Sequence, residues 1–149
     1  MKWATKQREL LAMLKAGAIY FVLVFGAGFI LGPIRILFVV PRFGVRVAEL
    51  MEAPVMLVVI VVAARWVVRR VHTEHRLAIG VLALGLTIVF EFTLVLWLRG
   101  LTLAEYFRER DPVAATVYYL LLIAFAFMPL LFSTRNSASE LHNEARKAG

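Results

Sequence analysis

The chain of 149 residues contains no cysteine. Disulfides, thiolate metal sites and thiol catalysis are therefore excluded. Its long apolar runs contain no histidine and no lysine, which argues against buried haem ligation and against a Schiff-base pigment. A Gly-rich phosphate loop, a Ser–His–acid set and an HExxH helix are missing as well. We therefore expect no cofactor, no metal site and no catalytic residues, and a non-enzyme rather than an enzyme.

Apolar residues, by contrast, are abundant. They make up 62% of the sequence, and the mean hydropathy is +0.82, whereas soluble domains contain about 45–50%. Four apolar runs approach or exceed the length of a membrane-spanning helix. The sequence therefore predicts an all-α fold, an integral membrane four-helix bundle occupying residues 16–132. Its helices are expected at about residues 16–38, 45–70, 77–98 and 113–132.

Basic residues set the expected orientation, because cytoplasmic segments of membrane proteins are rich in Lys and Arg. Eleven of the 17 basic residues lie in the amino end, in the link between the second and third runs, or in the tail. We therefore predict a bacterial inner-membrane protein with both termini in the cytoplasm. Residues 1–15 are expected to form a basic amphipathic segment, and residues 133–149 a polar, mobile tail. The same distribution argues against nucleic-acid binding.

The connections carry recognisable helix signals. Thr102 and Glu105 fit a capping box, which predicts a short interfacial helix over residues 103–110 in the second outer loop. Asp111 and Pro112 are typical of a helix cap and first turn. Pro54 leaves two geometries open: a helix that begins there, or one continuous helix over residues 45–70 with a kink. The continuous helix is favoured because the shorter one barely spans the hydrocarbon core.

Polar side chains from several predicted helices fall at similar depth in the outer half of the membrane. Glu91 lies about 5 Å from the centre of its helix at 1.5 Å per residue, and an ionised carboxylate there costs at least about 2.5 kcal/mol. Its partner must come from another helix, and Arg35 is the first candidate. The expected polar cluster, structural or ligand-binding, comprises Arg35, Arg42, Arg46, Glu49, Glu52, Glu91, Tyr118 and Tyr119.

Three readings of this cluster remain open: an interhelical pair that fixes packing, a pocket for a ligand, ion or lipid headgroup, and a proton-carrying or catalytic group. Gly28 and Gly32 have the spacing that lets helix backbones approach closely. They favour helix packing within the chain or a homo-oligomer.

The cytoplasmic link offers a weaker signal. His72 and His75 have near-ligand spacing, but the neighbouring arginines repel a cation, so no metal site is predicted. The expected partners at this end are the lipid bilayer and its anionic headgroups, which attract cytoplasmic basic clusters. The residues concerned are Arg69, Arg70 and Arg76.

The stretch GAGFILGPIRILFVVPRFGVRVAELMEAP, followed by AARW and EFTLVLWLRGLTLAEYFRERDP, resembles small bacterial membrane proteins of about this length. The likeness covers most of the chain between Ala16 and Phe132. It implies a four-helix inner-membrane fold, but that family has no established activity and assigns no functional residues.

The leading functional hypothesis is a non-enzymatic accessory or scaffold subunit whose polar cluster fixes packing or holds a membrane-complex partner. The alternative is a small oligomeric transporter or ligand-binding protein in which Glu91 couples to a proton or cation. A lipid-modifying enzyme ranks last, because no nucleophile is apparent.

Overall fold

The structure is a computed structural model that describes residues 2–71, 75–100, 102–108 and 111–147. Every element in these ranges is helical, which confirms the all-α prediction. The elements are α1 (Lys2–Ile34), the π-helical turn η1 (Arg35–Val39), α2 (Val40–Arg70), α3 (Arg76–Arg99), α4 (Leu103–Arg108) and α5 (Pro112–Lys147). α1 begins well before the predicted residue 16.

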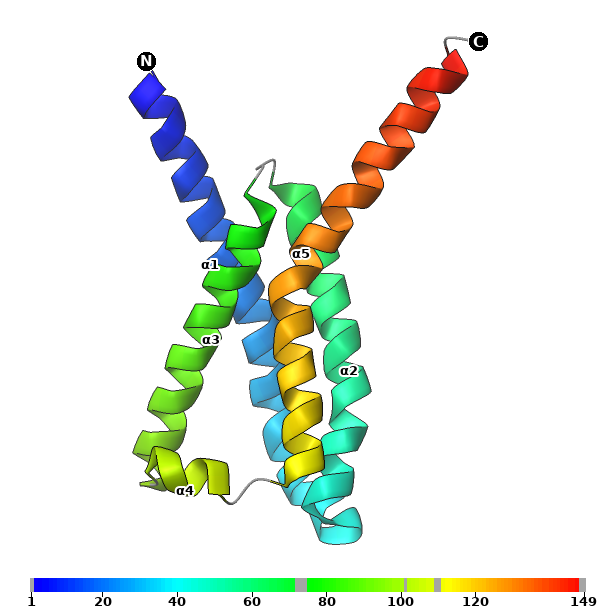
Figure 1. Ribbon diagram of the computed structural model, residues 1–149. Coiled ribbons are helices and arrows are strands. Elements are labelled where there is room, and N and C mark those ends of the chain that lie inside the picture. The colour runs from blue at the N-terminus through cyan, green and yellow to red at the C-terminus, as the bar shows by residue number, and fades with distance from the viewer. Residues whose placement is uncertain (1, 72–74, 101, 109–110, 148–149) are drawn as a thin grey trace.

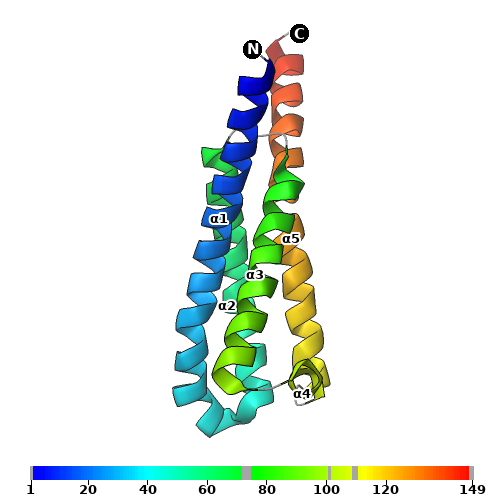
Figure 2. The same cartoon turned by 90° about the vertical axis from the view of Figure 1, so that its left-hand side faces the viewer.

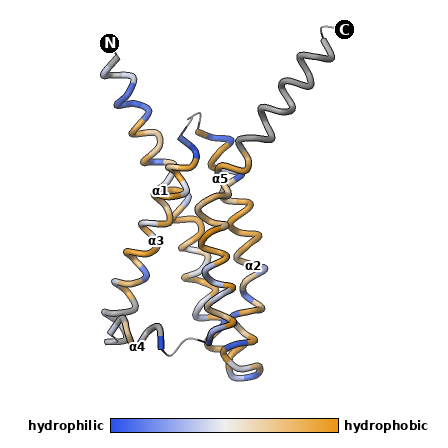
Figure 3. Tube along the Cα trace, viewed as in Figure 1, coloured by the Kyte–Doolittle hydropathy of each residue, from blue (hydrophilic) through white to orange (hydrophobic). Residues whose placement is uncertain are grey.

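Three helical segments are long and apolar enough to cross a membrane: Thr5–Arg70, Arg76–Leu94 and Pro112–Phe132. Hydrophobic residues dominate the bundle, while hydrophilic ones gather in the amino-terminal part of α1, at the upper turn and at the lower end (Figure 3). Many large apolar side chains point outward: Leu37 is 67% exposed, and Val58 and Val89 are each 61% exposed. These features are those of a membrane protein, in which such side chains meet lipid.

The first apolar segment folds back on itself. At η1 the amide of Val40 donates to the carbonyl of Arg35, five residues earlier, which widens the helix. Gly44 then adopts φ +80° and ψ +166°, a conformation open in practice only to glycine. The chain reverses there, so α1 descends and α2 returns (Figure 1). α2 continues through Pro54, as the continuous alternative predicts.

The long helices form a ring in which each packs mainly against two neighbours. α1 packs against α2 and α3, and α5 packs against the same two helices. Both chain termini lie at one end of the bundle in two perpendicular views (Figures 1 and 2). The expected mobile tail is instead the continuation of α5 to Lys147. No glycine or proline occurs between Pro129 and Gly149, so nothing in the backbone ends the helix earlier.

The half of the bundle nearer the termini is densely packed. The side chains of Tyr20, Ile79 and Phe125 are almost fully buried there, together with small residues such as Ala64 and Ala83. Gly80 permits the closest approach, because a Cβ added to it would lie 1.9 Å from the carbonyl oxygen of Ala126. We call this densely packed, apolar half of the bundle the apolar plug.

The opposite end carries the two predicted caps. The amide and hydroxyl of Thr102 each donate to Glu105 Oε2 across 2.8 Å, and the Glu105 amide returns a 3.4 Å bond to the threonine oxygen. Asp111 Oδ1 accepts hydrogen bonds from the amides of Val113 and Ala114 at 3.0 and 3.1 Å. Both caps are therefore confirmed, although residues 109–110 of the predicted short helix lie outside the described ranges.

Candidate functional site

A cavity of about 400 Å³ lies between the apolar plug and the end of the bundle that is remote from the termini. Side chains from α1, η1, α2, α3 and α5 line it, so residues far apart in the sequence meet at one level. Five of the eight residues of the predicted polar cluster are in its wall. These are Arg35, Glu49, Glu52, Glu91 and Tyr118.

Arg35 joins two acidic side chains of α2. Its Nη1 lies 3.1 Å from Glu52 Oε2 and 3.5 Å from Glu49 Oε1. Glu49 and Glu52 are three residues apart and so lie on neighbouring faces of the helix, where one guanidinium reaches both. The side chains are 16–26% exposed. The widened turn η1 and the reversal at Gly44 bring Arg35 opposite this face of α2.

Glu91 has a hydrogen-bond partner on α5, where the hydroxyl of Tyr118 donates a short hydrogen bond to Glu91 Oε2. The expectation that a neighbouring helix supplies a partner is confirmed. Arg35, the first candidate from the sequence, forms ion pairs with Glu49 and Glu52. Depth along the helix axis identified the candidates, but rotation about the axis decides which of them meet.

The remaining wall of the cavity is largely apolar and aromatic. Phe25 and Phe29 on α1 line it with their rings 6.5 Å apart and nearly parallel. Phe125 forms part of its boundary with the plug, and Thr87 contributes a hydroxyl that also donates to the carbonyl of Ala83 at 3.0 Å. Sequence reasoning missed these residues, because phenylalanine on an apolar helix carries no signal that separates a cavity wall from lipid contact.

Gly28 and Gly32 face the same cavity rather than a helix backbone. A Cβ added to Gly28 would touch only the end of Met56, at 3.5 Å, and one added to Gly32 would meet nothing within 4 Å. Within this chain Gly32 therefore makes no close helix contact. Because glycine has no Cβ, these positions leave open volume, and the close packing occurs at Gly80 instead.

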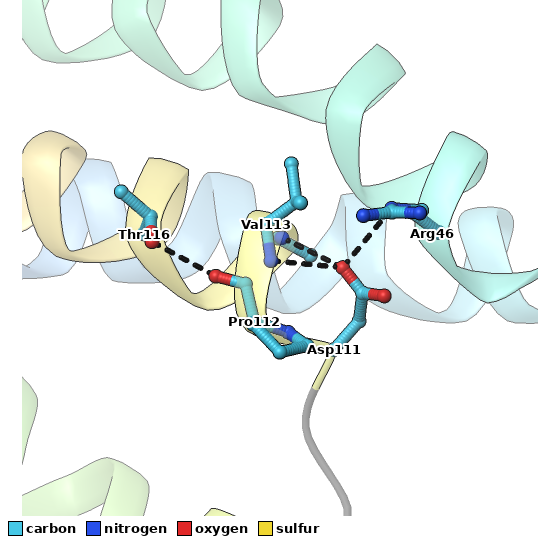
Figure 4. A network of polar contacts seen from close by, with 6 residues as sticks. Arg46, Asp111, Pro112, Val113 and Thr116 are labelled. Atoms are coloured by element: carbon cyan, nitrogen blue, oxygen red, sulfur yellow. Dashed lines mark hydrogen bonds and ion pairs between the residues drawn. The ribbon is translucent and has the colours of Figure 1, made fainter.

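Arg46 belongs to a separate ion pair below the cavity. Its Nε lies 3.2 Å from Asp111 Oδ1, the oxygen that also caps α5 (Figure 4). Thr116 closes the first turn by donating to the Pro112 carbonyl. This network joins the start of α2 to the start of α5. The residue Asp111 was predicted as a cap but not as an ion-pair partner.

The other two members of the predicted cluster lie outside the cavity wall. Arg42 is exposed in the reversal between α1 and α2. Tyr119 is 42% exposed, and its ring contacts that of Tyr118 with centroids 5.8 Å apart. One residue turns a helix by about 100°, so adjacent tyrosines cannot both face the cavity.

Glu105, outside the membrane-spanning segments, has a perturbed carboxyl group. Hydrogen bonds from the Thr102 amide, and then from the Thr102 hydroxyl, hold the pKa of Glu105 below its usual value of 4.5. The charged form is favoured because both groups donate to it.

The end of the bundle near the termini is basic. Arg70 stacks over the Trp66 ring with its guanidinium carbon 5.1 Å from the centroid, while His72 and Glu74 lie outside the described ranges. Within those ranges no group of three His, Asp or Glu side chains has the geometry of a metal site.

Comparison with known proteins assigns no relatives: the chain matches no family model, no curated protein and no solved structure. The chemistry of the cavity therefore carries the functional argument. It offers one guanidinium, three carboxyl groups, a phenol and a hydroxyl, set in an apolar and aromatic enclosure. Such a set can bind and orient a small molecule.

Proposed function

We propose that this chain is a small integral membrane protein that binds a small molecule in the cavity between α1, α2, α3 and α5. One observation carries the proposal: polar side chains from four elements converge on a cavity of about 400 Å³ with otherwise apolar walls. Ligand sites typically have about 300–1,000 Å³ and few, convergent polar groups in an apolar lining. Glu91 and Tyr118 supply one such polar pair, and Arg35 with its two carboxylates another.

Arg35 adds a second reason. Its Nε is buried and has no hydrogen-bond partner among the described residues. Buried polar groups in proteins nearly always find a partner in the protein, in water or in a ligand. This donor lies beside the cavity, because the Arg35 side chain is part of the cavity wall.

The scaffold hypothesis explains the same residues less fully. A cluster that serves only to fix packing is expected to fill its space, because protein interiors are packed as densely as organic crystals. Gly32 instead borders open volume, and the dense contacts lie in the other half of the bundle. The position of the polar groups around empty space favours binding.

We further propose that the chain crosses a bacterial inner membrane four times, with both termini in the cytoplasm. The first segment, Thr5–Arg70, folds back at Gly44 and so has two arms, each long enough for a crossing. The Lys and Arg bias supports the orientation. It places Arg69, Arg70 and Arg76 beside anionic cytoplasmic headgroups.

The absence of cysteine makes this topology testable with single-cysteine variants. A membrane-impermeant maleimide added to intact cells is expected to label Arg42→Cys, in the reversal. Thr5→Cys, near the amino terminus, is expected to react only after the cells are permeabilised. Labelling of Thr5→Cys in intact cells contradicts the orientation.

Ligand binding is tested by thermal unfolding of the purified full chain with a panel of lipids, inorganic ions, metabolites and aromatic ions. At least one compound is expected to raise the Tm of the wild type. Gly32→Leu, which fills the cavity, is expected to abolish that rise. Gly26→Leu is the matched control, because it lies on the same helix, has open space and is absent from the cavity wall. A panel that shifts Gly32→Leu as much as the wild type, or shifts no variant, contradicts the proposal.

A further inference from the structure

The acidic groups of the cavity outnumber the basic ones. Glu49, Glu52 and Glu91 contribute three carboxyl groups, whereas Arg35 is the one cationic side chain among the described residues of the wall. That guanidinium lies between Glu49 and Glu52, within 3.5 Å of an oxygen of each. A single positive charge is thus shared by two carboxylates, and the third carboxylate is held by a neutral phenol.

Such an excess of carboxyl groups is costly in apolar surroundings. An ionised carboxylate inside a membrane must be paired, hydrated or protonated. A ligand that brings a positive charge removes this cost, whereas an anionic ligand increases it. The charge balance of the wall therefore selects a cation.

The aromatic side chains narrow the class of cation. The rings of Phe25, Phe29 and Phe125 and the phenol of Tyr118 lie in the cavity wall. Aromatic faces attract organic cations, most strongly where water is excluded. A small inorganic cation gains little from such a wall.

We propose that the ligand is a hydrophobic monovalent organic cation, whose charge lies near Glu91 and Glu52 and whose apolar groups contact the phenylalanine rings. This inference rests on the proposed binding function and specifies its substrate class. The charged and titratable groups that face the ligand are Arg35, Glu49, Glu52, Glu91 and Tyr118.

Two ions of the same shape and opposite charge provide the test. Tetraphenylphosphonium and tetraphenylborate each carry four phenyl groups. A difference in their binding to the purified full chain therefore reports whether the site prefers a positive or a negative ligand. Equilibrium dialysis in detergent is expected to show saturable binding of the phosphonium alone.

Charge-neutral variants locate the cation. Glu91→Gln and Glu52→Gln each remove one negative charge with little change in shape, and each is expected to weaken phosphonium binding by about tenfold or more. If one of them fails to fold, the other still tests the inference. Glu9→Gln is the matched control, because Glu9 is exposed near the amino terminus and is absent from the cavity wall.

The outcomes separate this inference from the proposed function. Equal binding of both ions, preferential binding of the borate, or unchanged affinity in both glutamine variants overturns the cation inference. Binding of a neutral or anionic compound that is lost in Gly32→Leu also overturns it, while leaving a ligand-binding cavity in place. If no compound shows binding that Gly32→Leu abolishes, both the cation inference and the proposed ligand-binding function are overturned.

Discussion

The hydroxyl of Tyr20, on α1, donates a hydrogen bond to the carbonyl oxygen of Phe125, on α5, across 3.0 Å. The reason lies four residues further along α5, where Pro129 has no amide hydrogen to give to that carbonyl. Within a bilayer no water is available as a substitute, so another protein group must satisfy it. The two rings also stack, with centroids 4.6 Å apart. Tyr20 thus supplies the hydrogen bond that the Phe125 carbonyl lacks because residue 129 is a proline.

Tyr20→Phe is expected to lower the free energy of unfolding by about 1 kcal/mol, since interhelical hydrogen bonds in membranes contribute about that much. In a Pro129→Ala background the amide of residue 129 serves the same carbonyl, so the cost of Tyr20→Phe is expected to fall. Unfolding in detergent with increasing denaturant measures the four variants. An equal cost in both backgrounds contradicts the proposed link between Tyr20 and Pro129.

Gly80→Ala is expected to destabilise the bundle by about 1–3 kcal/mol, the usual range for overpacking. Its new Cβ would lie 1.9 Å from a backbone oxygen of α5, so the two helices must move apart. Gly85→Ala, one and a half turns along the same helix, meets nothing within 4 Å and is expected to be neutral or slightly stabilising. Thermal unfolding of both variants is the measurement. Similar Tm values for the two variants would show that the close contact at Gly80 does not limit the stability of the bundle.

Arg35→Met is expected to cost about 3–5 kcal/mol, because it leaves Glu49 and Glu52 in the bilayer without their shared partner. Adding Glu52→Gln to this variant is expected to recover part of the loss, since one carboxylate is then removed as well. Denaturant unfolding provides the free energies. A double variant that is less stable than Arg35→Met alone would argue that the ion pair is not the source of the effect.

The cap of α4 is expected to be sensitive to acid. Because the folded pKa of Glu105 is lowered, the cap contributes fully above the unfolded value of about 4.5 and is lost as the pH falls through the folded value. Titration of the Thr102 amide resonance by NMR follows this change. In Glu105→Gln the acid transition is expected to disappear, and an unchanged titration there would assign it to another group.

The depth of the site could be predicted from sequence because helical rise is constant. Counting from the centre of each apolar run placed Arg35, Glu52 and Glu91 in the same half of the membrane, and they do line one cavity. The caps at Glu105 and Asp111 were predictable for a similar reason, since each depends on residues three apart or fewer.

Pairing was harder to predict, because it depends on how each helix is rotated about its axis. That rotation is set by η1 and Gly44, and neither a π-helical turn nor a positive φ is specified by hydropathy. The ion pair of Arg46 with Asp111 depends in addition on where α4 returns the chain. Gly32 and Gly80 have no local feature that distinguishes open volume from close contact.

The contact of Gly80 with Ala126 also bears on two kinds of activity: binding and release of a ligand from one side, and its passage to the other side. A molecule in the cavity faces side chains that seal the route toward the termini. Capture and release from one side need no rearrangement of that seal. Passage to the other side requires the packing in that half of the bundle to loosen, and the contact of Gly80 with Ala126 is part of that packing.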